Sequence, residues 1–449
     1  MKNNRSRGAR SRDKLLLTGI LLSGSAVQLL YAGEFSYNLE YTGTRSDNIT
    51  RVPINERKET VHSLLAGFAY VEDTRDLVAR VLAQAEYHDY LKNVYDDETV
   101  FNLNSSLVWT ISPQRFQWTL EDSHRQDLVD STVVDTPSNR TNINVLSTGP
   151  DVYLRFAPLH VLALGARVGN VYTGSANLDN NRFNGSAGWL YQSSSVTTYS
   201  INYEILDVKY KDSTLNDDFR RQDVFFRTQF RPSRSQYELD LGTTEISRDR
   251  GNDLSDTLAK FSWLRQLTPE STFGVSAKRE FSDTATDILT ASTALTSGQI
   301  TAPPTLSRSV LTSDVYYAKR TEMFYTYRGN QVGVQFQAGR HNLDFELTNQ
   351  DREENGGRLR IEYFYSGATT LSLFTEYTST EYLNFVQRDR DNNSGVHLEY
   401  RLNRAISLGV EGRRNERSSS VATNNYVENQ ALFSVMYRSG SLFTPVSER

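Results

Sequence analysis

Several kinds of protein are excluded by what this chain lacks. It contains no cysteine, so neither disulfide bonds nor thiolate metal sites are available. Beyond residue 32, no apolar run is long enough for a membrane-spanning helix. Hydrophobic residues make up only 38% of the chain, which is too little for a thick globular core. The formal net charge of −5 argues against a nucleic-acid partner, because such proteins present a basic face.

The chain does contain a persistent alternation of apolar and polar residues. It runs through Phe35, Tyr37, Leu39 and Tyr41, and again through Leu77, Ala79, Val81, Ala83, Ala85 and Tyr87. Successive side chains of a strand point to opposite faces, so each segment has one apolar and one polar face. Many such segments of about ten residues are typical of a transmembrane β-barrel. The sequence therefore predicts an all-β, antiparallel up-and-down barrel of roughly 16–20 strands.

The first 32 residues have the features of a cleavable signal peptide. A basic start, with Arg5, Arg7, Arg10, Arg12 and Lys14, precedes a mostly apolar segment over residues 15–30, and Ala32 is a suitable cleavage position. An uncleaved membrane anchor is the alternative, although the segment is short for a spanning helix. We therefore expect a signal peptide over residues 1–32 and a barrel over residues 33–449 in the bacterial outer membrane.

Turn residues divide the chain into predicted hairpins. Short turns are expected at Ser112-Pro113, Ala157-Pro158, Arg231-Pro232-Ser233, Thr268-Pro269-Glu270, Arg328-Gly329-Asn330, Gly367-Ala368 and Asn403-Arg404. Longer acidic and amide-rich connections are expected at residues 44–57, 122–142, 212–218, 283–307, 351–357 and 384–394. Short periplasmic turns and long external loops are typical of outer-membrane barrels.

The alternation also separates two faces of the predicted wall. Apolar residues such as Trp109, Phe226, Leu241 and Tyr437 should face lipid. The residues between them should face the lumen: Arg80, Glu86, Arg167, Glu204, Arg227, Glu238, Asp240, Lys260, Lys278, Arg360, Glu362, Glu376, Glu399, Arg401, Glu411 and Arg413. Both charge signs are mixed, so no ion selectivity follows. These residues either line a path for a hydrated solute or pair with one another across neighbouring strands.

The longest connection is a candidate constriction of the lumen. It runs over residues 283–307 and includes Asp283, Pro303, Pro304 and Ser307. A loop of this length is usually functional or disordered. We expect it to act as a gate if it folds inward.

No residues form a convincing catalytic, cofactor or metal site. The six histidines lack metal-ligand spacing, and His124 with Asp122 and Ser123 is the only local cluster suited to relay chemistry. Adjacent residues of a strand point in opposite directions, which is poor geometry for such chemistry. Asp389, Asp391 and Asn393 alternate like the first ligands of a calcium loop, but the glycine and glutamate spacing does not fit. We expect a protein that is not an enzyme.

Several segments of the chain have a recognisable sequence: Gly33-Glu34-Phe35, Ser46-Asp47-Asn48-Ile49, the hairpins over residues 226–240 and 264–277, and residues 313–320. In these segments the chain resembles the β-barrel porin 2 family and the related exosortase-system-associated outer-membrane proteins. It implies a role in exporting exopolysaccharide or capsular polysaccharide through a hydrated lumen, with outer-membrane lipid, polysaccharide and periplasmic export components as partners. A diffusion porin for small solutes and a structural or adhesive surface barrel are the alternatives.

Overall fold

The computed structural model describes residues 33–174, 176–296 and 311–440 of the chain. The predicted signal peptide, residues 1–32, lies outside the described residues. Among the described residues, no helix is both long and apolar enough to cross a membrane.

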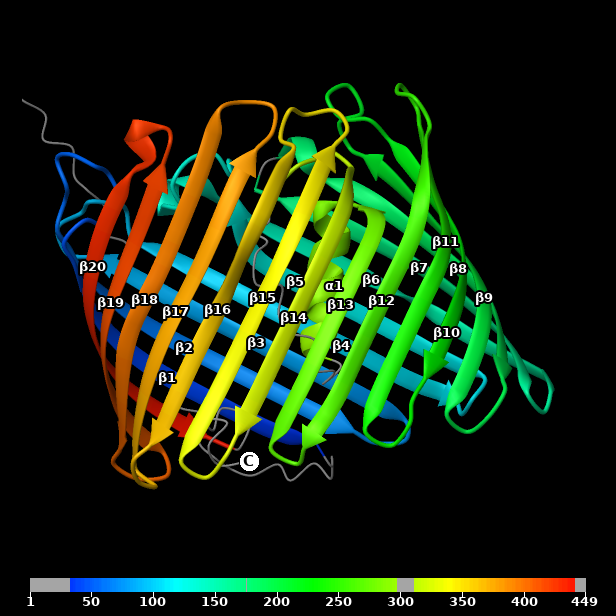
Figure 1. The fold of residues 1–449 in the computed structure, drawn as a ribbon, viewed down its shortest axis with the longest axis horizontal. Helices are drawn as coiled ribbons and strands as arrows, with labels where there is room; N and C mark the ends of the chain where they lie inside the picture. The colour runs from blue at the N-terminus through cyan, green and yellow to red at the C-terminus, as the bar shows by residue number, and fades with distance from the viewer. Residues whose placement is uncertain (1–32, 175, 297–310, 441–449) are drawn as a thin grey trace, which may run out of the picture. The chain divides into compact units, whose positions relative to one another are not determined.

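The described residues contain one sheet of twenty strands (Figure 1). The strands are β1 (Glu34–Ser46), β2 (Glu59–Asp73), β3 (Leu77–Tyr90), β4 (Glu98–Ser112), β5 (Phe116–Leu128), β6 (Arg140–Ala157), β7 (His160–Thr173), β8 (Asn180–Gln192), β9 (Thr197–Tyr210), β10 (Phe219–Phe230), β11 (Ser235–Arg248), β12 (Leu254–Thr268), β13 (Ser271–Ser282), β14 (Tyr316–Arg328), β15 (Val332–Phe345), β16 (Arg352–Phe364), β17 (Thr369–Tyr382), β18 (Gln387–Arg401), β19 (Ile406–Ser419) and β20 (Tyr426–Ser439). The helices are α1 (Thr284–Thr296) and the 3₁₀ turns η1 (Pro137–Asn139), η2 (Ala176–Leu178) and η3 (Ala422–Asn424).

The sheet closes on itself. Each strand pairs antiparallel with its neighbours in sequence, and β1 pairs with β20, where Tyr41 lies opposite Val435. Closure leaves no strand edge with unpaired backbone groups, which is the condition for crossing lipid with strands. The prediction of an antiparallel up-and-down barrel is confirmed, with the strand number at the upper end of the expected range.

Short turns join the strands at one end of the barrel. They include Pro158 between β6 and β7, Pro232 between β10 and β11, and Pro269 between β12 and β13. Proline is tolerated there because it cannot donate a ladder hydrogen bond within a strand. Every short turn expected from the sequence lies at this end, which is therefore the periplasmic end.

The opposite, external end carries the long connections, and three of them differ from the expectation. Residues 352–357 belong to β16, and residues 387–394 belong to β18. The connection predicted over residues 122–142 shrinks to residues 129–139. The sequence-based boundaries were wrong because strands continue past the apolar band. Backbone hydrogen bonds between strands require only extended backbone. Outside the lipid, neither face of a strand has to be apolar, so the alternation of apolar and polar residues is lost while the strand continues.

Large apolar side chains are exposed on the outside of the barrel. Trp109, Val224 and Leu241 are at least half exposed in the isolated chain. Near the periplasmic turns, rings stack across neighbouring strands, with centroids 5.8 Å apart for Phe230 and Tyr237 and 6.0 Å apart for Tyr237 and Trp263. Such a girdle is typical of the membrane interface.

Candidate functional site

The lumen wall is built from the residues that alternate with this apolar exterior. On β10, Arg227 follows exposed Phe226 and precedes half-buried Thr228, and on β11 Asp240 lies between exposed Leu239 and Leu241. Asp240 is fully buried, and the other fifteen residues predicted to face the lumen are half-buried.

Most of the charges on this wall are paired with a neighbour. Arg227 contacts Asp240 at 2.7 Å, and Lys260 contacts Glu280 at 2.6 Å. Further pairs are Arg167–Asp151 (2.6 Å), Glu376–Arg358 (3.0 Å), Glu399–Arg438 (2.5 Å), Glu411–Arg413 (2.6 Å) and Glu86–His88 (3.0 Å). The wall is therefore hydrophilic without a continuous track of one charge sign.

Phe374 is an aromatic side chain of the wall that the sequence did not single out. Phe374 lies opposite Arg360 in the register of β16 and β17, on the face away from exposed Leu373. The guanidinium carbons of Arg360 and Arg413 lie 5.8 and 5.6 Å from its ring centroid. The alternation could have identified this residue. The exposed residues Leu371, Leu373 and Tyr377 all have odd numbers, so Phe374 belongs to the opposite face of the strand.

A helix lies inside the barrel, between its front and back walls (Figure 1). It is α1, from the connection between β13 and β14. Its Ala285 and Ile288 are buried against Ile143 and Val145 of β6 and Val171 of β7. These strands are far from β13 and β14 around the barrel, so α1 reaches across the lumen.

The first turn of α1 is held by an ion pair with the wall. Asp283 accepts hydrogen bonds from the backbone amides of Ala285 and Thr286, at 3.0 and 3.2 Å, as an N-cap does. Arg182 of β8 donates to the same carboxylate at 2.6 Å. Burial opposes ionisation, but the Arg182 charge prevails and lowers the pKa of Asp283 to about 2.

A second contact ties α1 to the strand that follows it. Asp287 accepts a hydrogen bond from Tyr316 at 2.5 Å and another from Arg320 of β14 at 3.0 Å. Of the predicted constriction residues, the structure thus places Asp283 at the start of this inward helix. Pro303, Pro304 and Ser307 lie outside the described residues.

The connection between β5 and β6, residues 129–139, spans the external mouth; we call it the crossing loop. Its backbone carbonyls accept hydrogen bonds from side chains of the distant wall. Tyr382 donates to the carbonyl of Ser131 at 2.7 Å, and Gln387 and Asn424 each donate to that of Thr132 at 2.7 Å. Since β17–β19 lie many strands from β5 and β6 in either direction, the crossing loop bridges the mouth.

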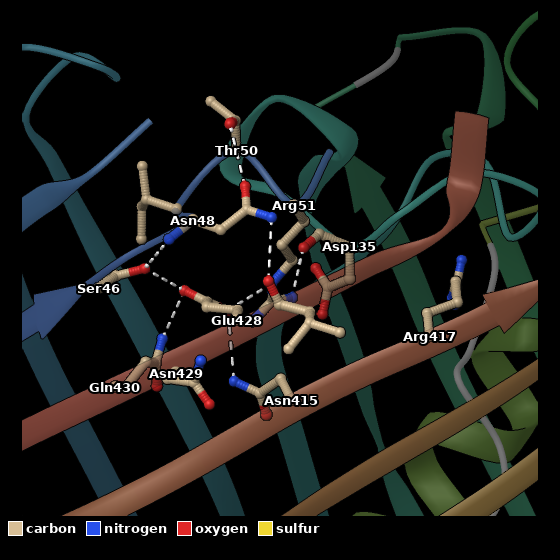
Figure 2. Close-up of polar contacts among 12 residues, drawn as sticks. Ser46, Asn48, Thr50, Arg51, Asp135, Asn415, Arg417, Glu428, Asn429 and Gln430 are labelled. Carbon is tan, nitrogen blue, oxygen red and sulfur yellow. Dashed lines mark hydrogen bonds and ion pairs between the residues drawn. The ribbon is translucent and has the colours of Figure 1, made fainter. Parts of the chain in front are cut away.

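A buried carboxylate anchors the end of the crossing loop (Figure 2). Glu428 of β20 is fully buried and accepts hydrogen bonds from Ser46 at 2.6 Å and from Arg51 at 3.0 Å. Arg51 also donates to the backbone carbonyl of Asp135 at 2.6 Å. Burial lowers the pKa of Arg51, but Tyr426, Glu428 and Asp135 outweigh it and raise the pKa above its ordinary value.

Arg417 of β19 provides a further anchor for the crossing loop. It pairs with Asp391 at 2.8 Å and donates to the carbonyl of Val133 at 3.1 Å. Asp389 and Asp391 are therefore strand residues beside an arginine, and the calcium-like spacing does not correspond to a loop. Among the described residues, no group of three or more candidate ligands could hold a metal ion.

The cluster of Asp122, Ser123 and His124 is split between the two faces of β5. Asp122 accepts a hydrogen bond from Asn144 at 2.6 Å, whereas buried Ser123 donates to Asn104 at 3.2 Å. His124 packs against the ring of Phe101, with centroids 5.4 Å apart. The three side chains thus engage different partners.

The chain is similar to known barrels in two comparisons. Residues 331–439 match the model of the family described as "Putative beta-barrel porin 2". No curated protein matches the chain significantly.

Solved structures give distant matches. The FrpB iron transporter from Neisseria meningitidis (F3-3 variant) is 10% identical, with coverage of 90% of this chain and 81% of that one and a TM-score of 0.46. OccK2 (OpdF) from Pseudomonas aeruginosa is 8% identical, with coverage of 92% and 98% and a TM-score of 0.38. OpdK from the same organism is 9% identical, with coverage of 91% and 99% and a TM-score of 0.36. At such distances these likenesses do not indicate a substrate.

The fold, the exterior and the family match agree on the class of protein. A closed antiparallel barrel exposes apolar side chains outward and a charged wall inward, and its last strands match a porin family. The chain is a porin-like β-barrel of the bacterial outer membrane.

Proposed function

We propose that this barrel passes polysaccharide, or supports its passage, from the periplasm to the cell surface. The observation that carries the proposal is the lumen wall, on which carboxylates and cations are paired rather than ordered by sign. Such a wall offers hydrogen bonds at many positions without trapping a solute electrostatically. Two likenesses support the proposal: residues 331–439 match a porin family, and the chain resembles export-associated barrels.

The mechanism involves no chemistry on the polymer. A polysaccharide would diffuse or be pushed through the hydrated lumen, with periplasmic export components as partners. Because α1 and the crossing loop occupy the lumen and its mouth, passage requires one or both to move. Release of the crossing loop from β17–β19 would open the external end.

The test compares cells with and without the gene. Surface polysaccharide and periplasmic polysaccharide are measured side by side, and the deletion is complemented with the wild-type gene. We expect loss at the surface with retention inside the cell. Unchanged polysaccharide in both compartments would reject export.

A second candidate is a diffusion porin for small solutes. The inward position of α1 favours it, because a narrowed lumen suits small molecules better than a polymer. Swelling of liposomes that contain the purified barrel would then follow solute size, and the deletion would leave surface polysaccharide unchanged.

A further inference from the structure

A hollow of about 250 Å³ lies in the lumen wall formed by β6–β10. Its lining includes Asp151, Ser186, Asn202, Glu204 and Arg227. The flanking residues Trp189, Ile201 and Phe226 are exposed on the lipid side, so the side chains between them point inward. The hollow therefore opens toward the solute path.

Two glycines create the hollow. A Cβ at Gly165 would lie 2.5 Å from the Ser186 hydroxyl and 3.0 Å from Asp151 Oδ1, and one at Gly188 would lie 2.7 Å from Asn202 Oδ1. Any larger side chain would fill the space and displace these polar atoms. Glycine inside a strand weakens it and often marks a site of close approach by another molecule.

The lining matches the chemistry of a sugar ring. Hydroxyl groups of Ser186 and Ser200 and the amide of Asn202 supply donors and acceptors at short spacing. Tyr153 adds an aromatic surface on which the apolar face of a sugar can pack. A mixture of convergent polar groups with an apolar surface is typical of ligand sites.

The charges of the hollow are not balanced. Asp151 is paired with Arg167 at 2.6 Å, and Arg227 is held by Asp240 at 2.7 Å, with Glu238 at 3.6 Å. Over the described residues, Glu204 has no ion pair within 4.0 Å; Arg221 and Arg227 attract it from farther away, but each makes its short contact with another carboxylate, Asp223 at 3.2 Å and Asp240 at 2.7 Å. The surplus is therefore negative, and Glu204 is the carboxylate left to meet a ligand cation.

We propose that this hollow is a subsite for an amino-sugar unit, with the ammonium group on Glu204 and the ring hydroxyls on Ser186, Ser200 and Asn202. The inference rests on the proposed function, because it takes carbohydrate as the solute. It adds to that function a preference for the charge of the sugar. Cationic sugars bind more tightly than neutral ones, and anionic uronate units are disfavoured.

The test is calorimetric titration of the full-length barrel in detergent, which requires only that the probe reach the hollow from one end of the lumen and not that it pass through. The probes are hexamers of glucosamine, N-acetylglucosamine and galacturonate. We expect affinity to fall in that order, with the glucosamine hexamer bound at least about tenfold more tightly than the galacturonate hexamer. Added salt should weaken the glucosamine binding.

Two substitutions assign the binding to this hollow. Glu204→Gln should weaken glucosamine binding about tenfold and leave N-acetylglucosamine binding unchanged, whereas Gly188→Val should abolish both. Glu362→Gln is the matched control, because Glu362 is a half-buried wall carboxylate of β16 without an ion pair within 4.0 Å in the described part of the chain. Heat-dependent gel migration confirms that each variant is folded.

Other outcomes overturn the subsite without deciding the function. The absence of glucosamine binding to the folded barrel, tighter binding of galacturonate, or an unchanged affinity in Glu204→Gln would each reject it. If the deletion strain still lost surface polysaccharide, export would stand and only the subsite would fail. If amino-sugar binding were present while surface polysaccharide was unchanged, the subsite would serve a small-solute porin.

Discussion

At the residue scale, two buried carboxylates with several partners each hold segments at the lumen of this barrel. Glu428 and Asp283 are both almost completely buried, and each accepts hydrogen bonds from an arginine and from further donors. Burying a charge is costly unless such partners are present. Each carboxylate belongs to a contact that holds an inward segment, so its ionisation bears on the shape of the lumen.

The Asp283–Arg182 pair predicts a pH dependence. The pKa of Asp283 is lowered from 3.8 to about 2, so the pair stabilises the folded state above the ordinary pKa, and this contribution is lost as the pH falls toward 2. The part of the single-channel conductance that depends on Asp283 should therefore be constant between about pH 5 and pH 8 and change only below about pH 4. At neutral pH, the variant Asp283→Asn should have the conductance that the wild type shows only in acid, because its side chain carries no charge. A conductance step near neutral pH that Asp283→Asn removes would contradict this assignment.

At the scale of elements, two connections from different parts of the barrel enter or cover the lumen. The connection after β13 places α1 against β6 and β7, and the crossing loop reaches β17–β19. The backbone amide of Leu311 donates to the carbonyl of Leu128 at 3.0 Å, just before the crossing loop begins. The two connections therefore meet beside the end of β5.

Removing α1 tests whether it narrows the lumen. Replacement of residues 284–310 by a short Gly-Ser linker should raise single-channel conductance severalfold, because the helix leaves the interior. A matched control replaces residues 249–253, an exposed external connection between β11 and β12. Equal conductance in the wild type and the α1 deletion would show that this segment does not restrict flow.

Removing the donors beneath the crossing loop tests its attachment. The triple variant Tyr382→Phe, Gln387→Ala and Asn424→Ala loses the hydrogen bonds to Ser131 and Thr132, each worth about 1 kcal/mol. Protease added outside intact cells should then cleave residues 129–139 faster. The exposed, lipid-facing Tyr377→Phe is the control. Unchanged cleavage in the triple variant would mean that Arg51 and Arg417 hold the loop without help.

At the scale of the whole molecule, closure of the sheet gives the backbone groups of every strand a hydrogen-bonding partner strand on both sides. The side chains meet two different surroundings, one on each face of the wall. Lipid surrounds the exposed apolar residues, and water or solute meets the charged wall. The pairing of β1 with β20 completes this separation, because no open strand edge remains at which lipid and the lumen could come into contact.

The two faces should respond oppositely to a new charge. Leu241→Arg places a cation on the lipid side. Near the bilayer midplane it should destabilise the barrel folded in vesicles by about 2–4 kcal/mol. Ser262→Arg, on the lumen side of β12 and opposite Glu238, should have little effect. Urea titrations in lipid vesicles measure both. Equal losses would mean that the assignment of faces is wrong.

The sequence by itself determined the class of fold and the short turns, and it predicted which residues face the lumen. These features are local: alternation has a period of two, and proline marks a turn without reference to distant residues. It also singled out the long connection that begins at Asp283. It misplaced the external ends of β16 and β18, because strand pairing outside lipid leaves no hydrophobic pattern.

Only the tertiary structure decided which connections enter the lumen and what holds them. Arg182 meets Asp283, Arg51 meets Glu428, and the hollow above Gly165 and Gly188 forms only when the strands β6–β10 lie side by side. These contacts join residues that are far apart in the chain. Their partners depend on strand order, register and closure around the barrel, which no local pattern encodes.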